Sequence, residues 1–293
     1  MISSVDLCSG DGWSVRDCHC DAGPRDRPFV EQRPYVSVAL VSCGTFTYRS
    51  TYGTSFLTPG SILLCDAATD FECRHEYGTG DRCVDFRFDG AFIEGLAAAH
   101  SLPRLPFSVY RIPMLADRLA LSSEILAQAR HPDALRLEEL ALHLAELSLR
   151  ANASAAKLPC VSYGDVERAS AVAQFIEERY TEPLSLAQLA AVAGLSKYHL
   201  VRSFRKTAGV TPYQYVLHVR MIEAARRLRS TMLPVTDVAT GCGFGDLSEF
   251  NRRFRRFFEV SPAAYRKNGY RRASAGSGES ESRPSSKPIV RPA

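Results

Sequence analysis

The second half of the chain contains one sequence unit twice. Residues 189–195 return as residues 238–244, 49 positions later, and residues 204–215 return as residues 254–265 at an offset of 50. The two copies share small residues, a glycine, aromatic residues and a proline at matching positions. A period of this length indicates one supersecondary unit used twice. We expect each unit to consist of a helix, a tight turn and a second helix whose outer face carries arginine.

The first unit has helix start and stop signals at the spacing of a helix-turn-helix. Ser185 stands three residues before Gln188, which is the spacing of a capping box. Gly194 suits the left-handed residue that ends a helix. Ser196 is then placed to cap the next helix, over residues 197–207, so that only three residues separate the two helices. In the second copy Asp246 takes the capping position.

A long helix is expected to join the two units. Thr211-Pro212 combines a capping residue with a proline at the first helical position. The predicted helix runs from Pro212 to about Arg229. A rigid spacer of this kind would hold two second helices near one turn of DNA apart, about 34 Å, on the same face of a duplex.

The outer faces of the two second helices are predicted to contact DNA. Leu200 and Phe204 match Phe250 and Phe254 in the other copy and must face the core, which leaves the opposite face exposed. Arginine and asparagine pair with guanine and adenine edges at about 1–3 kcal/mol of discrimination each. For any single arginine the alternative is a phosphate contact or a solvated charge. The expected DNA-binding residues are Ser196, Lys197, Tyr198, Val201, Arg202 and Arg205 in the first unit, and Leu247, Ser248, Asn251, Arg252 and Arg255 in the second.

Charge is distributed unevenly along the chain. The formal net charge of +4 combines −6 over residues 1–165, +9 over residues 166–272 and +1 over the tail. A basic module fused to an acidic one indicates a polyanionic partner for the basic half alone. A basic face that is merely solvated is the alternative.

The composition also bounds where the protein acts. No basic segment followed by a long apolar run stands near Met1, and no stretch approaches the 18 or so apolar residues of a membrane span. Nine cysteines without a signal sequence indicate free thiols rather than a disulfide framework. We therefore expect a cytoplasmic protein without a membrane partner and without a cofactor.

The first half is predicted to form short strands followed by helices. Between about residues 35 and 88, strands of about five residues recur every ten or so, with turns at Gly53, at Pro59-Gly60 and between Gly78 and Gly80, which would mark a hairpin. This spacing indicates a small antiparallel barrel or sandwich. Leucines at helical spacing in 114–130 and 134–150, broken at 131–133, predict a helical hairpin that either packs on the barrel or forms a dimer surface.

Residues 166–272 resemble the DNA-binding domain of the AraC/XylS family of bacterial transcription regulators. The second unit carries that family's signature in Val238-Ala239, Gly243-Phe244, Asp246, Ser248, Phe250, Arg252, Phe254, Ser261-Pro262 and Tyr265-Arg266. The resemblance implies two helix-turn-helix units in adjacent major-groove segments of double-stranded promoter DNA, with RNA polymerase as a further partner. It also implies base contacts from Tyr198, Val201, Arg202, Ser248, Asn251 and Arg252. One departure is Glu259, where the family and Gly209 of the first unit have glycine.

The same resemblance implies that the first half is a cupin-like domain that binds a small-molecule effector or forms a homodimer. Seven of the nine cysteines lie in the first 83 residues. We expect Cys20, Cys73, His75 and Cys83 to converge, with Cys83 across the hairpin from Cys73 and His75, as a candidate site for sensing a metal or an oxidant. Buried cysteines without a special role are the alternative. The His-x-His strand of metal-binding cupin enzymes is absent, so a metallo-cupin enzyme with a DNA-binding tail is the less favoured reading.

Taken together, the sequence predicts an α+β protein that is not an enzyme. Its expected parts are a cupin-like antiparallel β-barrel with a helical hairpin in residues 1–150, a linker in 151–165, an all-α DNA-binding domain with two helix-turn-helix units joined by a long helix in 166–272, and a disordered tail in 273–293. The expected function is sequence-specific transcription regulation, controlled by an effector or by dimerisation. A metal- or thiol-dependent redox sensor is the main alternative.

Overall fold

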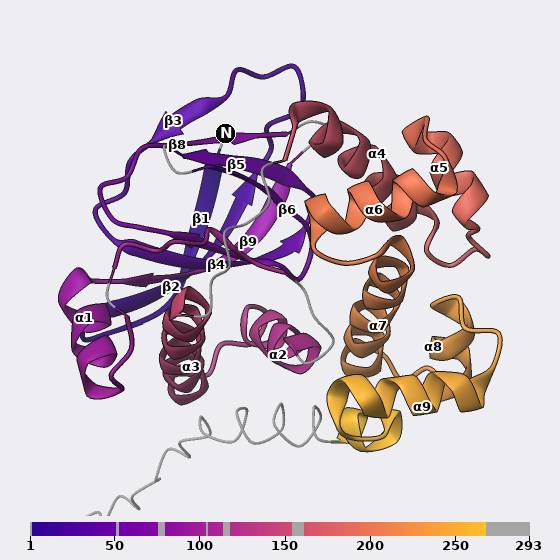
Figure 1. Cartoon of the computed structure of the whole chain (residues 1–293). Helices are drawn as coiled ribbons and strands as arrows, with labels where there is room; N and C mark the ends of the chain where they lie inside the picture. The colour runs from indigo at the N-terminus through magenta and orange to yellow at the C-terminus, as the bar shows by residue number, and fades with distance from the viewer. Residues whose placement is uncertain are drawn as a thin grey trace, which may run out of the picture.

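The computed structural model describes residues 2–50, 53–75, 80–103, 105–113, 118–153 and 161–267. Among these described residues, strands and three helices make up the first half, and the elements of the second half are helices (Figure 1). The strands are β1 Ile2–Gly10, β2 Trp13–Cys20, β3 Phe29–Glu31, β4 Val36–Cys43, β5 Phe46–Ser50, β6 Gly53–Leu57, β7 Ile62–Cys65, β8 Phe71–Arg74, β9 Asp81–Phe88 and β10 Arg111–Ile112. The helices are α1 Gly90–Ala99, α2 Leu119–Gln128, α3 Ala134–Ala153, α4 Tyr163–Arg179, α5 Leu186–Ala193, α6 Lys197–Ala208, α7 Pro212–Ser230, α8 Val235–Gly241 and α9 Leu247–Phe258.

The strands form two antiparallel sheets. One has six strands in the order β1-β2-β9-β4-β7-β10, and the other has four in the order β3-β8-β5-β6. A cluster of buried side chains that includes Val41, Tyr48 and Leu57 draws on strands of both sheets. Strands β4 to β9 confirm the predicted strand positions, and the antiparallel pairing confirms the predicted kind of sheet.

The expected hairpin between residues 71–75 and 83–88 is wrong. β8 pairs with β3 and β5, whereas β9 pairs with β2 and β4, so the chain crosses from one sheet to the other between them. Gly80 has the left-handed backbone expected of a turn, at φ +76°, and Gly78 lies outside the described residues. The turn residues were correctly recognised, but they mark a crossover because the hydrophobic residues on either side belong to different layers.

Three helices pack against the six-stranded sheet. Ile93 of α1, Ile125 of α2 and Leu144 of α3 belong to one buried cluster with side chains of β2, β4, β7 and β9. α3 begins where the sequence predicted a helix, at Ala134, and α2 lies inside the predicted 114–130, of which residues 114–117 are outside the described range.

The second half forms two helical bundles with α7 between them (Figure 1). α4, α5 and α6 share a core with the start of α7, including Ala173, Leu189 and Phe204. The end of α7 shares a second core with α8 and α9, including Leu228 and Phe254. α3 ends at Ala153 and α4 begins at Tyr163, both within the expected 151–165 linker, and the expected tail lies outside the described residues. None of the helices in the described part of the chain is long and apolar enough to cross a membrane.

Candidate DNA-binding surface

The first helix-turn-helix unit consists of α5, a three-residue turn and α6. Ser185 and Gln188 form the expected capping box, because each side chain bonds to the backbone N–H of the other. Gly194 adopts φ +62°, and the backbone N–H of Leu195 donates to the Ala190 carbonyl at 3.0 Å, which closes the end of α5. The Ser196 hydroxyl then accepts from the backbone N–H of His199 at 3.3 Å and starts α6. The predicted caps of this unit are confirmed.

The second unit repeats this geometry with different side chains. Gly243 adopts φ +82°, and the Phe244 N–H donates to the Ala239 carbonyl at 3.0 Å, in the position of the Leu195 bond. Asp246 caps α9 by accepting from the backbone N–H of Glu249 at 2.6 Å. The left-handed glycine and the backbone hydrogen bond after it match in the two units, but the second turn spans residues 242–246 and contains Gly245 as an additional residue, whereas the first spans residues 194–196.

The two second helices expose matching positions. Leu200 and Phe204 are buried in α6, and Phe250 and Phe254 are buried in α9. Along the twelve residues of each helix the alternation of buried and exposed positions is the same except at His199 and Glu249. The predicted DNA-binding residues lie on the remaining face, where Ser196, Lys197, Tyr198, Arg202, Arg205, Leu247, Ser248, Arg252 and Arg255 are exposed and Val201 and Asn251 are partly buried.

The arginines of this surface differ in their ion pairs. Arg252 is paired with Glu249, and its side chain is 76% exposed. Glu249 also pairs with Arg253 in the same helix. Within the part of the chain that the structure describes, Arg202, Arg205 and Arg255 form no ion pair, so their guanidinium groups face solvent without a protein partner. An open groove of about 770 Å³ runs along α9, lined by Leu247, Ser248, Asn251, Arg252 and Arg255 together with residues 261–263.

Comparison with known proteins identifies the kind of protein that carries this surface. A family model described as a helix-turn-helix domain matches residues 189–268, which span both turns. An uncharacterized HTH-type transcriptional regulator of Bacillus subtilis, YbfI, is 31% identical over 201 residues, which cover 66% of this chain and 70% of the relative. The chain belongs to the AraC family of transcriptional regulators. It is a DNA-binding transcription regulator and not an enzyme.

Two solved structures with DNA-binding domains of this kind are similar to part of the AraC-family chain. One is an AraC-type regulator of Chromobacterium violaceum, 26% identical, with 37% of this chain and 96% of that chain covered and a TM-score of 0.35. The other is the DNA-binding domain of the transcriptional factor AdpA in complex with a target DNA, 32% identical, with 38% and 98% covered and a TM-score of 0.35.

The two units of the AraC-family domain differ in the residue that ends their second helix, but the backbone conformation there is the same. Glu259 adopts φ +62° at the end of α9, as Gly209 adopts φ +82° at the end of α6. Each of these residues donates its N–H to the carbonyl four residues earlier, at 2.8 Å and 2.9 Å. The left-handed geometry therefore persists with a side chain that disfavours it.

The sheet domain of this AraC-family regulator touches the first unit through a buried arginine. Arg111 of β10 is 6% exposed, and its guanidinium donates to the Phe56 carbonyl at 2.8 Å and to the Thr207 carbonyl. Burial lowers the pKa of Arg111 to about 10, so the group stays charged at neutral pH. Thr207 lies in the last turn of α6, where carbonyl groups point away from the helix and attract a cation. Phe56 itself belongs to the core of the first unit.

The second unit is contacted by α2. Leu119 belongs to the core formed by α7, α8 and α9. Glu124 pairs with Arg229 of α7 at 3.0 Å, and the hydroxyl groups of Ser123 and Tyr265 are hydrogen-bonded. The sequence offered no signal for these contacts, because each joins residues more than 90 positions apart.

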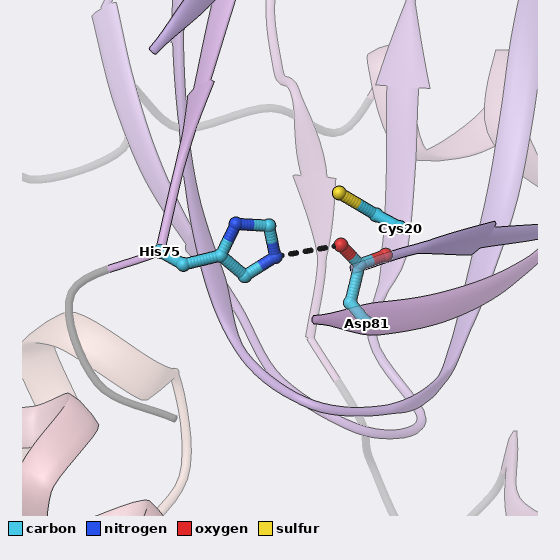
Figure 2. Close-up of side chains that lie close together, drawn as sticks. All are labelled: Cys20, His75 and Asp81. Atoms are coloured by element: carbon cyan, nitrogen blue, oxygen red, sulfur yellow. Dashed lines mark hydrogen bonds and ion pairs between the residues drawn. The ribbon is translucent and has the colours of Figure 1, made fainter. Parts of the chain in front are cut away.

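The residues expected to form a sensor site lie around one cavity of the sheet domain. Cys20, Cys73, His75 and Cys83 all line one pocket of about 100 Å³, which is partly open to solvent. Of these, Cys20 and His75 come close enough to share a metal ion, but the third member of their group is Asp81, which the sequence did not indicate (Figure 2). Cys83 contacts the same carboxylate, donating from Sγ to Asp81 Oδ2 at 3.2 Å. The sequence could not place Asp81 beside Cys20, because the two residues pair across β2 and β9, which are far apart in sequence.

Proposed function

We propose that this regulator binds an asymmetric site in double-stranded promoter DNA with α6 and α9 in successive major-groove segments. The main observation behind this proposal is that α6 and α9, which have equivalent N-caps, expose basic faces at the two ends of α7. α7 has 19 residues, which at 1.5 Å each span about 28 Å, close to the 34 Å of one DNA turn. The site is asymmetric because Tyr198, Val201 and Arg202 read one half, whereas Ser248, Asn251 and Arg252 read the other.

We further propose that the first half controls this binding. In this proposal the first half is a cupin-like domain that binds a small-molecule effector or forms a homodimer. RNA polymerase is the proposed protein partner on the bound promoter. The support for control is the contact of Arg111 with the end of α6 and of α2 with the second unit. A change in the sheet domain that moved either contact would alter the orientation of a DNA-reading helix.

Selection of DNA sequences by the purified protein tests the proposed contacts. Arg202→Ala and Arg252→Ala should each relax preference at a different part of the selected site and weaken binding to that site by about 1–3 kcal/mol, or roughly fivefold to 150-fold. Binding to unrelated DNA should change much less, because it depends on the summed phosphate contacts.

The matched control is Arg150→Ala. Arg150 is an exposed arginine of α3 in the first half, paired with Glu146, so this variant removes the same charge away from the proposed surface. If Arg202→Ala and Arg252→Ala keep the wild-type sequence preference, or lose no more affinity than Arg150→Ala, the assignment of α6 and α9 as base-reading helices is wrong.

A further inference from the structure

Three side chains with different donor atoms meet at one end of the two-sheet domain. Cys20 is the last residue of β2, Asp81 is the first residue of β9, and the two are directly paired across these strands. His75 follows β8 of the other sheet. The Cys20 sulfur, one His75 ring nitrogen and one Asp81 carboxylate oxygen all lie within 4.8 Å of one another (Figure 2). Both sheets therefore contribute to the cluster.

The backbone holds this cluster in place without help from a ligand. The Gly80 N–H donates to the Ala22 carbonyl at 2.7 Å, which ties the residue before Asp81 to the segment that follows Cys20. A Cβ atom on Gly80 would lie 2.3 Å from the Cys20 carbonyl oxygen, and Gly80 has φ +76°, so only glycine fits this close approach. The three donor groups are thus positioned by strands and by a fixed crossing of the chain.

The donor set matches a borderline-soft divalent cation. Zinc accepts thiolate sulfur, imidazole nitrogen and carboxylate oxygen, with bonds of about 2.0–2.3 Å, whereas calcium and magnesium take oxygen ligands. Two ligand atoms on a tetrahedral zinc lie about 3.3 Å apart at these bond lengths. His75 Nε2 and Asp81 Oδ1 are 2.8 Å apart in a hydrogen bond, so a small side-chain rotation brings them to that separation.

The buried position favours a bound cation over three separate groups. The side chains of His75 and Asp81 are 2% and 12% exposed, and Cys20 is 6% exposed. A thiolate and a carboxylate carry two negative charges, which a divalent cation neutralises where solvent cannot. The adjoining cavity of about 100 Å³ has room for a water molecule as a fourth ligand.

We propose that Cys20, His75 and Asp81 form a zinc site with three protein ligands and a fourth position facing the cavity. On binding, the Cys20 S–H bond breaks, a Zn–S bond forms and the proton leaves to solvent, with no change in oxidation state. This site is a property of the sheet domain and does not depend on how α6 and α9 read DNA.

Metal titration of the untagged full-length protein tests the site. Protein freed of metal with a chelator should bind one Zn²⁺ per chain in competition with a chromophoric chelator, and release about one proton per zinc from Cys20. Co²⁺ in place of Zn²⁺ should give a sulfur-to-cobalt charge-transfer band and the visible spectrum of tetrahedral coordination. Cys20→Ser, His75→Gln and Asp81→Asn should each weaken zinc binding more than about 100-fold, the upper range for losing an outer-shell partner.

Two cysteine variants serve as matched controls. Cys43→Ser changes an exposed thiol in β4, and Cys83→Ser changes a buried thiol that touches Asp81 but lies outside the ligand group. Both should retain one zinc per chain and the charge-transfer band. A thermal unfolding transition of each metal-free variant that matches that of the metal-free wild-type protein shows that it is folded, and a variant that fails this check is replaced by Cys20→Ala or Asp81→Ala.

Three results would overturn the proposal. They are substoichiometric zinc in the wild-type protein, a cobalt spectrum without the sulfur band, and zinc binding that survives Cys20→Ser but is lost in Cys43→Ser. Each of these is independent of DNA binding, so failure of the zinc site leaves the proposed reading of DNA untouched.

Discussion

Gly209 and Glu259 occupy the same position in the two units, but their surroundings differ. Both have left-handed backbone at the end of the second helix of their unit. A Cβ atom on Gly209 would also lie 2.7 Å from Cβ of Pro113 in the sheet domain, so this position needs glycine for its conformation and for its neighbour. Glu259 is exposed. The contact with the sheet domain therefore requires glycine at this position of the first unit. The second unit makes no such contact through Glu259.

Replacing Glu259 should reveal the cost of its backbone. We expect Glu259→Gly to raise the free energy of unfolding by about 0.5–1 kcal/mol, because glycine relieves left-handed strain of about 1–2 kcal/mol but adds freedom to the unfolded chain. Glu259→Ala is the control, since it removes the same charge and keeps the strain. Chemical denaturation of both variants measures the difference, and equal stability of the two would show that Glu259 is not strained.

Glu177 gives the first unit a dependence on pH. Its carboxylate accepts from the Tyr215 hydroxyl at 2.5 Å, and burial raises its pKa from 4.5 to about 7. Between these two values the folded protein binds more protons than the unfolded chain, so stability falls as pH rises from about 4.5 to 7 and stays lower above that.

Glu177→Gln should remove this dependence. The amide keeps an oxygen that accepts from Tyr215 and cannot ionise, so we expect the variant to be more stable than wild type at pH 8 by about 1–3 kcal/mol and nearly equal at pH 5. Thermal unfolding at the two pH values measures this, with the exposed neighbour variant Glu178→Gln as control. A difference from wild type that is the same at pH 5 and pH 8 would contradict a raised pKa.

At the scale of elements, the duplicated units could be predicted from the sequence almost completely. Their signals are local, because caps, glycines and helical spacing all act within a few residues, and the structure confirms Ser185, Gly194, Ser196 and Asp246 in their expected roles. Most of the expected DNA-binding residues are exposed, as a DNA-reading face requires. These local signals were enough to predict the two units, because the residues that form each turn are close together in the sequence.

The sheet domain was less predictable, because its strands are stabilised by pairing with distant segments. β1, β2, β3, β10 and α1 were not predicted. β1 is mostly exposed and lacks the alternation that marks a half-buried strand. One signal was available in Asp11-Gly12, a dipeptide typical of two-residue hairpins, which connects Gly10 to Trp13. Asp81 could not have been linked to Cys20 and His75, since only the sheet order brings them together.

An acidic residue on α9 should moderate DNA binding. Glu249 pairs with Arg252 and Arg253, and its negative charge lies beside the proposed DNA surface. Glu249→Gln would release Arg252 and remove the charge, so we expect DNA binding to tighten by about fivefold, which corresponds to the roughly 1 kcal/mol upper value of an exposed ion pair. Titration of labelled DNA at low and high salt measures the gain, which should shrink as salt rises.

The control for this effect is Glu259→Gln at the opposite end of α9. It removes the same charge from the same helix without touching Arg252. An equal gain from both variants would mean that net charge alone accounts for the effect and that the Glu249–Arg252 pair does not restrain the surface.

At the scale of the whole molecule, the sheet domain supplies residues to both helical cores. Phe56 of β6 is part of the core of the first unit, and Leu119 of α2 is part of the core of the second. Arg111 and the Glu124–Arg229 pair add charged contacts at the same two places. The two helix-turn-helix units are thus joined to one another by α7, and each is also packed against the sheet domain. Both sets of contacts restrain the orientation of one unit relative to the other.

Leu119→Ala should therefore loosen the second unit although the substitution lies in the first half. Removing a buried leucine side chain costs about 2–5 kcal/mol, and Leu119 is fully buried against α7, α8 and α9. Hydrogen exchange should increase in peptides from α9 and from the end of α7, whereas peptides from β4 stay protected. Ile125→Ala is the matched control, because Ile125 is equally buried on the same helix but packs against the six-stranded sheet. It should increase exchange in the sheet and spare α9. If the two variants affect α9 equally, Leu119 is not the specific link between the sheet domain and the second unit, and α2 acts only by its overall position.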